Sequence, residues 1–405
     1  MTPAAPAQTL PGPDAVRARV RAVLDAHWQD VGYTVPNQRV YPHQWLWDSC
    51  FHAVIWSHLG VPDRGVAELR NVFAHQSDDG FVPHMTYWRA AQMHEEFWGR
   101  SHTSSITQPP MYGHAIAELA RLGTTVDRDL VDAARAGLEF LLRGRERDGA
   151  VVIVHPWESG CDDSPRWDAW ADTPWTPAAW KRQKGDLVAA VRLDPSTGAS
   201  IGNPAFEVAS SAFEALVTFN ALELATVAPE DAALVELRSA ALALGARTRA
   251  RWDGARRTFV DRHVCGIPRS VVGPGSSSVR TLEALLPVLC GEAGGGPAND
   301  DEVFAPVVDA AAFGAACGPA QVHRGEESYD PGRYWRGGTW PQLSYLVWLA
   351  ARRSGREAVA RSVRDATVRG AWRSGLAEYW DPDTGSGLGA IPQTWTGLAA
   401  VMAGA

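Results

Sequence analysis

The alternation of short and long connections between predicted helices is the feature that most limits how this chain can fold. Apolar residues at helical spacing, separated by Gly and Pro breaks, predict twelve helices, at about 14–28, 48–59, 62–77, 106–122, 128–146, 206–226, 230–252, 278–290, 299–315, 338–353, 356–373 and 393–404. The connections after the even-numbered helices are short. Those after the odd-numbered helices are long, at about 29–47, 78–105, 147–205, 253–277, 316–337 and 374–392. Six helical hairpins with every long loop at one end predict an all-α fold, a single (α/α)6 toroid with six loops around one mouth.

The long loops are where we expect function, because long loops inside a compact domain are usually active-site or binding loops. We predict that 1–405 is one catalytic domain and that 147–205 is a long active-site or lid loop. Most of the 18 tryptophans fall on such loops or at their junctions, at positions 45, 47, 88, 98, 157, 167, 170, 175, 180, 335, 340 and 380. Indole is a flat apolar platform with one N–H donor, which suits the apolar face of a pyranose. We therefore expect these loop tryptophans to line a sugar site, and only those inside helices to be core residues (Trp28, Trp56, Trp252 and Trp348).

The composition excludes several classes of partner. A net charge of −8 argues against binding to nucleic acid and against a polybasic membrane contact. The five cysteines are odd in number and form no C-x-x-C pair, so they predict reduced thiols and neither a disulfide framework nor a zinc site. The start of the chain lacks the basic and apolar segments of a signal peptide. We expect a cytoplasmic protein without metal or cofactor, and the sequence leaves homo-oligomerisation open.

Three of the loops place acids beside aromatic residues. Asp48 follows Trp45 and Trp47 in the first, and predicts either a helix N-cap or an acceptor for sugar hydroxyls. The second loop, HPWESGCDDSPRWDAW at 155–170, contains four acids and three tryptophans. In the third loop Glu378 precedes Tyr379 and Trp380, whereas Asp381 and Asp383 predict a turn.

Hydrolysis of a glycosidic bond requires two carboxyl groups in different protonation states. Crowding by Glu158 and Asp163, together with indole walls that exclude water, predicts a raised pKa for Asp162, which would suit a proton donor. Glu378, from the far end of the chain, would stay ionised and polarise a water molecule across the mouth.

Four pieces of the sequence resemble glycoside hydrolase family 63 and its bacterial mannosylglycerate and glucosylglycerate hydrolases. They are WLWDSCFHA (45–53), PWESGCDDSPRWD (156–168), YDPGRYWRGGTWPQ (329–342) and EYWDPDTGSGLGA (378–390) with the following WTG (395–397). The resemblance implies an inverting mechanism, with Asp162 as general acid and Glu378 as general base. It places these residues in sugar-binding motifs: Trp45, Trp47, Asp48, Trp157, Tyr334, Trp335, Arg336, Gly337 and Trp340.

The resemblance also implies a substrate, a small α-glucoside or α-mannoside, with glucosylglycerate or mannosylglycerate as the leading candidate. Tyr41 and Gln393 fall at positions that hold the glycerate end, and His84, Gln108 and Glu158 complete the predicted substrate-binding set. The chain departs from the family at two positions, with Asp163 where the family has Asn and Gly338 where it has Pro. A glycerate carboxylate would also require a cationic pocket, for which the candidates are Arg166, Lys181, Arg182, Lys184, Arg333 and Arg336.

Three other functions stay open from the sequence. One is an α-glucosidase acting on disaccharides or oligosaccharides. Another is a sugar epimerase or isomerase on the same toroid, which would use paired histidines as acid and base, with His52, His75, His84 and His102 available. The third is a sugar-binding or regulatory protein without catalysis, which would need the tryptophans but not two placed carboxylates.

Overall fold

The structure is a computed structural model that describes residues 10–171, 175–265, 279–293 and 300–405. It is rich in helices, and each of the twelve predicted helices overlaps an observed one. The longer helices are α1 (Pro13–His27), α2 (Leu46–His58), α3 (Pro62–Phe73), α5 (Tyr112–Arg121), α6 (Arg128–Gly144), α7 (Pro177–Ala189), α8 (Ser211–Ala225), α9 (Ala232–Arg249), the 3-10 helix η3 (Glu283–Ala293), α10 (Asp300–Val308), α11 (Pro341–Arg353), α12 (Glu357–Arg373) and α13 (Leu398–Ala403). Shorter ones are α4 (Glu95–Trp98), η1 (Pro156–Ser159), η2 (Pro165–Trp170) and η4 (Thr394–Gly397).

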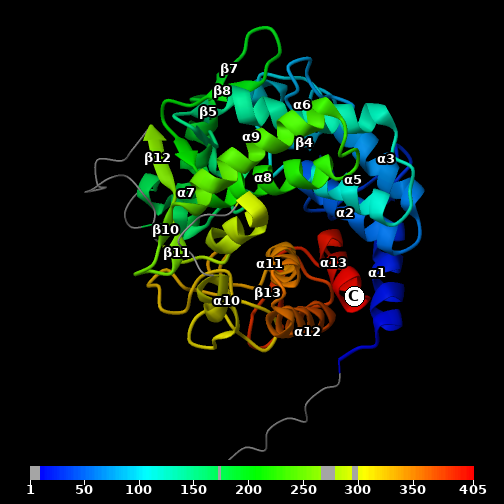
Figure 1. The fold of residues 1–405 in the computed structure, drawn as a ribbon, viewed down its shortest axis with the longest axis vertical. Helices are drawn as coiled ribbons and strands as arrows, with labels where there is room; N and C mark the ends of the chain where they lie inside the picture. The colour runs from blue at the N-terminus through cyan, green and yellow to red at the C-terminus, as the bar shows by residue number, and fades with distance from the viewer. Residues whose placement is uncertain (1–9, 172–174, 266–278, 294–299) are drawn as a thin grey trace, which may run out of the picture.

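The inner helices form a closed circuit of contacts (Figure 1). In order around the circuit they are α2, α5, α8, η3, α11 and α13, and α13 returns to α2. Outer helices cover this circuit. Each inner helix contacts the outer helix that is its partner in the pairs α2–α3, α5–α6, α8–α9, η3–α10, α11–α12 and α13–α1, and α5, α8, η3 and α13 each contact a second outer helix as well (α3, α6, α9 and α12). Five of these pairs are consecutive hairpins, and the sixth joins the two ends of the chain. The alternation of short and long connections in the sequence therefore corresponds to the alternation of inner and outer helices in the structure.

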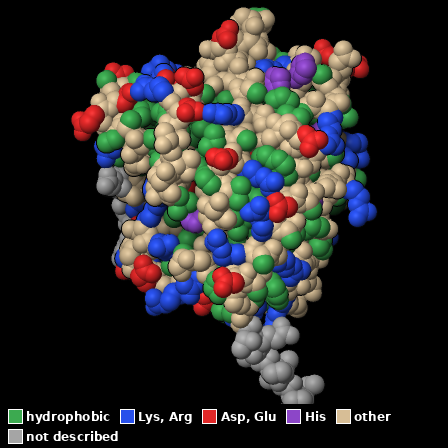
Figure 2. All heavy atoms as spheres, turned by 90° about the vertical axis from the view of Figure 1, so that its right-hand side faces the viewer, with side chains coloured by type: hydrophobic (Ala, Val, Ile, Leu, Met, Phe, Trp, Pro, Cys, Tyr) green, Lys and Arg blue, Asp and Glu red, His purple; other side chains and the backbone are tan. Residues whose placement is uncertain are grey.

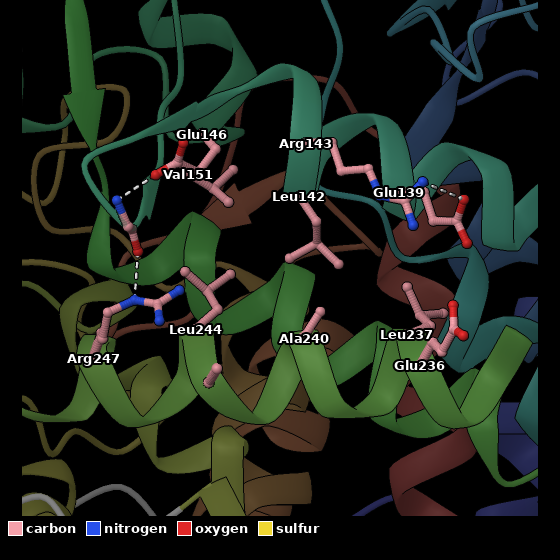
Figure 3. A pocket seen from close by; sticks show the side chains of 12 residues that line it. Glu139, Leu142, Arg143, Glu146, Val151, Glu236, Leu237, Ala240, Leu244 and Arg247 are labelled. Carbon is pink, nitrogen blue, oxygen red and sulfur yellow. Dashed lines mark hydrogen bonds and ion pairs between the residues drawn. The ribbon is translucent and has the colours of Figure 1, made fainter.

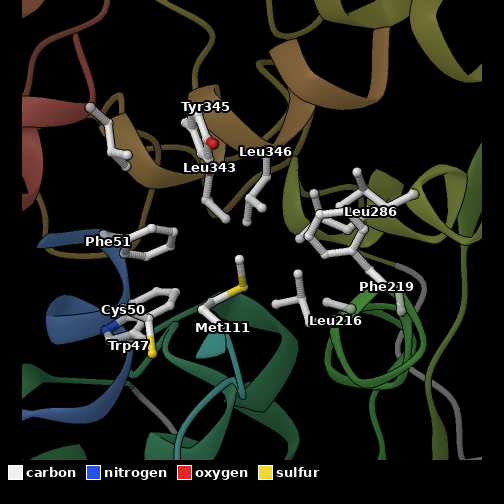
Figure 4. Packing of buried hydrophobic residues seen from close by; sticks show 14 of the residues in the cluster. Trp47, Cys50, Phe51, Met111, Leu216, Phe219, Leu286, Leu343, Tyr345 and Leu346 are labelled. Carbon is white, nitrogen blue, oxygen red and sulfur yellow. The ribbon is translucent and has the colours of Figure 1, made fainter. Parts of the chain in front are cut away.

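Burial distinguishes the two kinds of helix. The inner helix α2 is buried along its whole length except at His58, whereas the outer helix α6 buries one stripe that includes Leu130, Ala134 and Leu138. A helix surrounded by other helices needs apolar or satisfied residues on every side, and a covering helix needs only one such face. The centre of the ring is filled by large side chains (Figure 4), among them Trp47, Phe51, Met111, Leu216, Phe219, Leu286, Leu343, Tyr345 and Leu346.

Several elements differ from the sequence prediction. Helix α10 ends at Val308 and not near 315. Helix α5 begins at Tyr112 and not near 106, because Pro109 and Pro110 lack the N–H groups of a helix interior. The helix predicted at 278–290 is the 3-10 helix η3, which contains Pro287. The loop 147–205 contains helix α7, which the sequence reading missed, so this loop is not structureless. The long connection predicted at 253–277 lies partly outside the described residues.

Within the described residues, short antiparallel strand pairs fix the long loops. The pairs are β1 (Trp28–Gln29) with β2 (Tyr33–Thr34), β3 (Gln44–Trp45) with β4 (Met85–Thr86), β5 (Glu146–Arg147) with β6 (Ala150–Val151), β7 (Arg192–Leu193) with β8 (Ser200–Gly202), β9 (Glu207–Ala209) with β12 (Arg262–Cys265), β10 (Trp252–Asp253) with β11 (Thr258–Phe259), and β13 (Tyr379–Trp380) with β14 (Gly387–Leu388). The register of β3 with β4 places Trp45 opposite Met85. Two separate loops are thereby joined into one wall.

The face of the molecule in Figure 2 mixes basic and acidic side chains, so it presents no large field of one sign. Searched over the described part of the chain, the helices include none with the length and apolar character needed to cross a bilayer.

Candidate active site

One narrow pocket collects most of the predicted site residues at the N-terminal ends of the inner helices. Its cavity volume is about 50 Å3. The lining side chains precede or begin α2, α5, α11 and α13, or come from the loop 147–205: Pro36, Tyr41, Trp45, Trp47, Asp48, Gln108, Gly160, Asp162, Tyr334, Trp335, Glu378, Gln393 and Trp395. We call this the two-acid pocket, because it brings Asp162 together with Glu378 from the opposite end of the chain.

Asp162 is held in the two-acid pocket through the backbone of its loop. The indole N–H of Trp180, on α7, donates to the Asp162 carbonyl oxygen (3.3 Å), and that of Trp167 donates to the Cys161 carbonyl oxygen (2.8 Å). Gly160 has a φ of +73°, and a Cβ atom at this position would lie 2.6 Å from the Trp47 ring. Only glycine therefore allows the loop to approach Trp47 this closely.

The pKa of Asp162 is raised to about 7, first because the carboxyl is buried, and further by the negative charges of Asp163 and Glu378, while Lys184 opposes the rise. A carboxyl group with this pKa keeps a substantial protonated fraction near neutral pH and can donate a proton. Glu158, which the sequence suggested would crowd Asp162, is not among the main causes of this shift.

Glu378 is fixed by three hydrogen bonds. Its Oε1 atom accepts from the hydroxyls of Tyr41 (2.8 Å) and Tyr334 (3.1 Å), and its Oε2 atom accepts from the backbone N–H of Ala390 (2.8 Å). Burial raises the pKa of Glu378, and these three donors counteract that rise because they favour the ionised form. A carboxylate with donors on both oxygens suits a base that must stay ionised.

Asp48 is a third buried acid in the same pocket. Helix α2 begins at Leu46 with Trp45 at the N-cap position, so Asp48 lies inside the first turn and is not the N-cap. Burial, followed by the charge of Glu378, raises the pKa of Asp48 well above its usual value. None of the side chains that line the two-acid pocket is Lys or Arg, so the lining itself supplies no positive charge to pair with the three acids.

Four buried polar atoms of the lining residues have no hydrogen-bond partner in the described part of the chain. They are Trp45 Nε1, Gln108 Oε1, Trp335 Nε1 and Gln393 Oε1. Buried polar atoms are paired in most native proteins. Two free donors and two free acceptors around one pocket indicate a ligand with many hydroxyl groups.

Two further predicted residues, His84 and Trp157, line an adjacent pocket that shares Asp162 with the first. Four others line neither pocket. Glu158 is fully buried and binds Arg145 with both oxygens (2.8 and 2.9 Å), so it holds the loop in place. Trp340 stacks between Trp335 (3.5 Å between ring centroids) and Tyr379 (4.6 Å), where it supports a wall of the two-acid pocket.

Arg336 and Gly337 also act away from the pocket. The Arg336 guanidinium binds both oxygens of Asp168 (2.5 and 2.7 Å) and lies 3.9 Å from the Trp175 ring centroid. Gly337 has a φ of +143° and packs against Tyr329. Several loop tryptophans are likewise buried as packing residues, including Trp167, Trp180 and Trp380. Loops of this length need a core of their own, which the expectation of sugar platforms overlooked.

Three of the lining residues, Pro36, Gly160 and Trp395, were not predicted from the sequence. Trp395 lies in the WTG segment, and its indole N–H donates to the Glu378 carbonyl oxygen (3.1 Å). The WTG motif could therefore have indicated Trp395 as a site residue. No motif indicated Pro36, because it precedes the first aromatic motif in a stretch without acids.

Two other features lie outside this pocket. A hollow between α6 and α9, lined by Leu142, Leu237 and Leu244 among others (Figure 3), shares no residue with it. In the described part of the chain one cluster, His114, Glu118 and Glu223, has ligand atoms close enough together for a metal ion. Arg121 and Arg353 already bind Glu223 (2.7 and 2.8 Å). Their guanidinium groups supply the positive charge that a metal ion would otherwise bring to this carboxylate.

Comparison with known proteins is consistent with this geometry. The family model for the mannosylglycerate hydrolase MGH1-like glycoside hydrolase domain matches residues 41–396. A glucosylglycerate hydrolase from Mycolicibacterium hassiacum is 28% identical, over 96% of this chain and 97% of its own. A mannosylglycerate hydrolase from Thermus thermophilus is 28% identical, over 91% of this chain and 96% of its own.

A solved structure gives the same answer for the fold. A glycoside hydrolase family 63 mannosylglycerate hydrolase from Thermus thermophilus, in complex with Tris, has a TM-score of 0.78 at 26% identity, and the match covers 96% of this chain and 99% of that one. The family match spans the loops that supply both acids. The chain therefore belongs to the mannosylglycerate hydrolase MGH1-like glycoside hydrolases.

Proposed function

We propose that this glycoside hydrolase is an inverting α-glycosidase in which Asp162 is the general acid and Glu378 the general base. The observation that carries the proposal is that these two carboxyl groups line one pocket and have different surroundings. Asp162 has a pKa raised to about 7 by burial, whereas Glu378 receives two tyrosine hydroxyls and a backbone N–H.

The reaction follows from these two states. Asp162 donates its proton to the glycosidic oxygen as the bond from that oxygen to the anomeric carbon breaks. Glu378 removes a proton from a water molecule, whose oxygen attacks the anomeric carbon from the opposite face of the sugar. The products are the free hexose, with inverted configuration, and the aglycone alcohol. A proton then moves from Glu378 to Asp162 through solvent, which restores the starting state.

The remaining lining residues suit a hexose. Trp47 and Trp395 supply apolar surface, and the unpartnered atoms of Trp45, Gln108 and Gln393 can pair with hydroxyls. We assign Asp48 as an acceptor for sugar hydroxyls, because a buried acid without a cation gains most from such donors. The closed circuit of inner helices, each with its outer partner, supports a single (α/α)6 toroid as the catalytic domain.

The relatives named glucosylglycerate and mannosylglycerate hydrolase make these two compounds the first substrates to test. The alternative of an epimerase finds no support in the two-acid pocket, which has no histidine among its lining residues. The test is hydrolysis of glucosylglycerate and mannosylglycerate, followed by proton NMR during the first turnovers. We expect the β-anomer of the released sugar to appear first. Initial release of the α-anomer would contradict the inverting assignment.

A further inference from the structure

A second and larger cavity, of about 280 Å3, adjoins the two-acid pocket. The two share Trp45, Gln108 and Asp162, but Glu378 lines only the first. In an inverting hydrolase the acid faces the leaving group and the base lies on the other side of the sugar ring. A cavity that touches the acid and not the base is therefore where the leaving group would lie.

Aromatic and aliphatic side chains form the walls of this second cavity: Met85, Tyr87, Phe97, Trp98 and Trp157. Trp98 contacts Phe97 (4.7 Å between ring centroids) and Trp157 (6.0 Å). Its indole N–H donates to the Tyr87 hydroxyl (2.7 Å), so the main donor of this wall is already used.

The walls are held by backbone pairing and so form a preorganised site. Met85 is paired with Trp45 across β3 and β4. On either side, the Leu46 N–H donates to the His84 carbonyl oxygen (2.9 Å), and the Ser104 N–H donates to the Met85 carbonyl oxygen (3.1 Å). Phe97 is different, because it lies on the short helix α4 and is 45% exposed at the rim.

Cationic side chains do not line this cavity in the described part of the chain. Besides the Tyr87 phenol, its ionisable groups are Asp162 and the imidazoles of His84 and His94. Burial lowers the pKa of His84 to about 3, so that ring is uncharged at neutral pH. The side chains that the sequence offered for a carboxylate have other acidic partners or are exposed: Arg166 binds Asp261, Lys184 binds Asp163, Arg333 binds Asp330, Arg336 binds Asp168, and Lys181 and Arg182 are exposed.

We propose that this cavity, the aromatic aglycone pocket, binds a neutral six-membered ring as the leaving group. The enzyme would thereby have a further activity on α-glycosides whose aglycone is an aryl group or a second hexose, beside the glycerate compounds. Ring faces of both kinds pack well on indole and phenyl surfaces, and the cavity approaches the roughly 300 Å3 at which small-molecule sites begin. The inference rests on the proposed function, since it takes Asp162 as the acid.

The experiment compares kcat/KM for methyl and benzyl α-glycosides in both the gluco and manno series. Methoxide and benzyloxide are similar leaving groups, so the ratio reports binding of the ring. We expect benzyl to be favoured about tenfold or more, the effect of filling an apolar pocket. An α-linked disaccharide as a further substrate distinguishes an aryl aglycone from a hexose aglycone. If its kcat/KM exceeds that of the methyl glycoside, the pocket also accepts a hexose. If its kcat/KM is equal or lower, the pocket accepts only aryl rings.

Two variants make the result specific to the pocket. Phe97→Ala should bring the benzyl-to-methyl ratio close to one. Met93→Ala is the matched control, because Met93 is 39% exposed on the same loop and does not line the pocket. The α-glycosyl fluoride, whose aglycone is a single atom, should be hydrolysed equally by wild type and both variants.

Two outcomes would overturn the inference alone: a benzyl-to-methyl ratio near one in the wild type, or a ratio that Phe97→Ala leaves unchanged, in each case with the fluoride hydrolysed. If the wild type hydrolyses neither the fluoride nor any glycoside, the proposed function fails and this inference fails with it.

Discussion

Two of the groups of buried acids on the inner helices and their loops differ in their partners. In the two-acid pocket, Asp48, Asp162 and Glu378 have no Lys or Arg among the other lining residues, and the pKa of each is raised, with burial as the main cause. In the second group, the ion-paired cluster, Glu223 lies within 2.9 Å of His114 and binds two arginines. Burial would raise the pKa of Glu223 as well, but hydrogen bonds from His114 and Arg353 hold it well below its usual value.

The two groups are joined through one line of aromatic contacts. Trp47, in the two-acid pocket, packs on Phe51, and Phe51 packs on Tyr345. The Tyr345 hydroxyl lies 2.8 Å from His114 Nε2, where the ion-paired cluster begins. The same framework therefore supports acids that are neutralised and acids that are not. We infer that the first kind stabilises the fold, while the second costs stability and supplies reactivity.

The largest expected effect is on catalysis in the two-acid pocket. Asp162→Asn and Glu378→Gln should each lower kcat by about 10^2–10^4, the contribution of a general acid or base. Neither amide has to lose the hydration of a charge on folding, so the melting temperature should stay level or rise. Steady-state kinetics and calorimetry on the same preparations measure both. Full activity in either variant would remove that residue from the mechanism.

The opposite pattern is expected in the ion-paired cluster. Glu223→Gln leaves Arg121 and Arg353 without their carboxylate, and should lower the free energy of unfolding by about 3 kcal/mol, the low end for a broken buried ion pair because both arginines are partly exposed. Denaturant titration measures this loss, while kcat per folded molecule should not change. An unaltered unfolding midpoint would show that the pairing contributes nothing.

The pH dependence of this loss has a definite sign. The folded-state pKa of Glu223 is lowered, so its stabilisation is present above the unfolded-state pKa and disappears as the pH falls through the folded-state value. Wild type and Glu223→Gln should therefore differ most near neutral pH and converge in acid. A constant difference across that range would attribute the loss to packing and not to charge.

The contrast between the two groups also shows what sequence could and could not predict. The helices were predictable because inner and outer helices carry different apolar patterns, and ten predicted residues line the two-acid pocket because their motifs are local. The direction in which a side chain points is not determined by its neighbours in the sequence. Glu158 and Asp162 are four residues apart, yet Glu158 binds Arg145 at the end of α6, a partner that only the tertiary fold selects.

Helix α7 was missed for a related reason. Its buried positions are Trp180, Lys184 and Val188, so a lysine interrupts the apolar stripe that would have indicated a helix. Lys184 can be buried there because it forms an ion pair with Asp163. A pattern that depends on an ion pair from another segment cannot be read from hydrophobicity.

A smaller effect is expected from the tyrosines that hold Glu378. Tyr41→Phe removes one donor that favours the ionised carboxylate, so the pKa of Glu378 should rise further. Because the base must be ionised, the acidic limb of the kcat/KM profile, which reports the free enzyme, should move to higher pH. Below the optimum kcat/KM should be about tenfold lower, which corresponds to the loss of one of the weaker hydrogen bonds to a charged group. Tyr345→Phe, in the ion-paired cluster, is the control and should leave that limb in place. A limb that stays fixed in Tyr41→Phe would assign Tyr41 to substrate binding alone.

The smallest effect concerns the only ion pair next to the general acid in the described structure, Asp163 with Lys184. The two charges act on Asp162 in opposite directions, since Asp163 raises its pKa and Lys184 lowers it. Asp163→Asn removes the first influence and leaves the second unopposed. The pKa of Asp162 should then fall, and the alkaline limb of the kcat/KM profile, which reports loss of the proton from the acid in the free enzyme, should move to lower pH. Lys184→Met should move the same limb to higher pH, and the double variant should lie between the two. If both single variants move it in the same direction, the pair acts on the position of the loop and not on the charge of the acid.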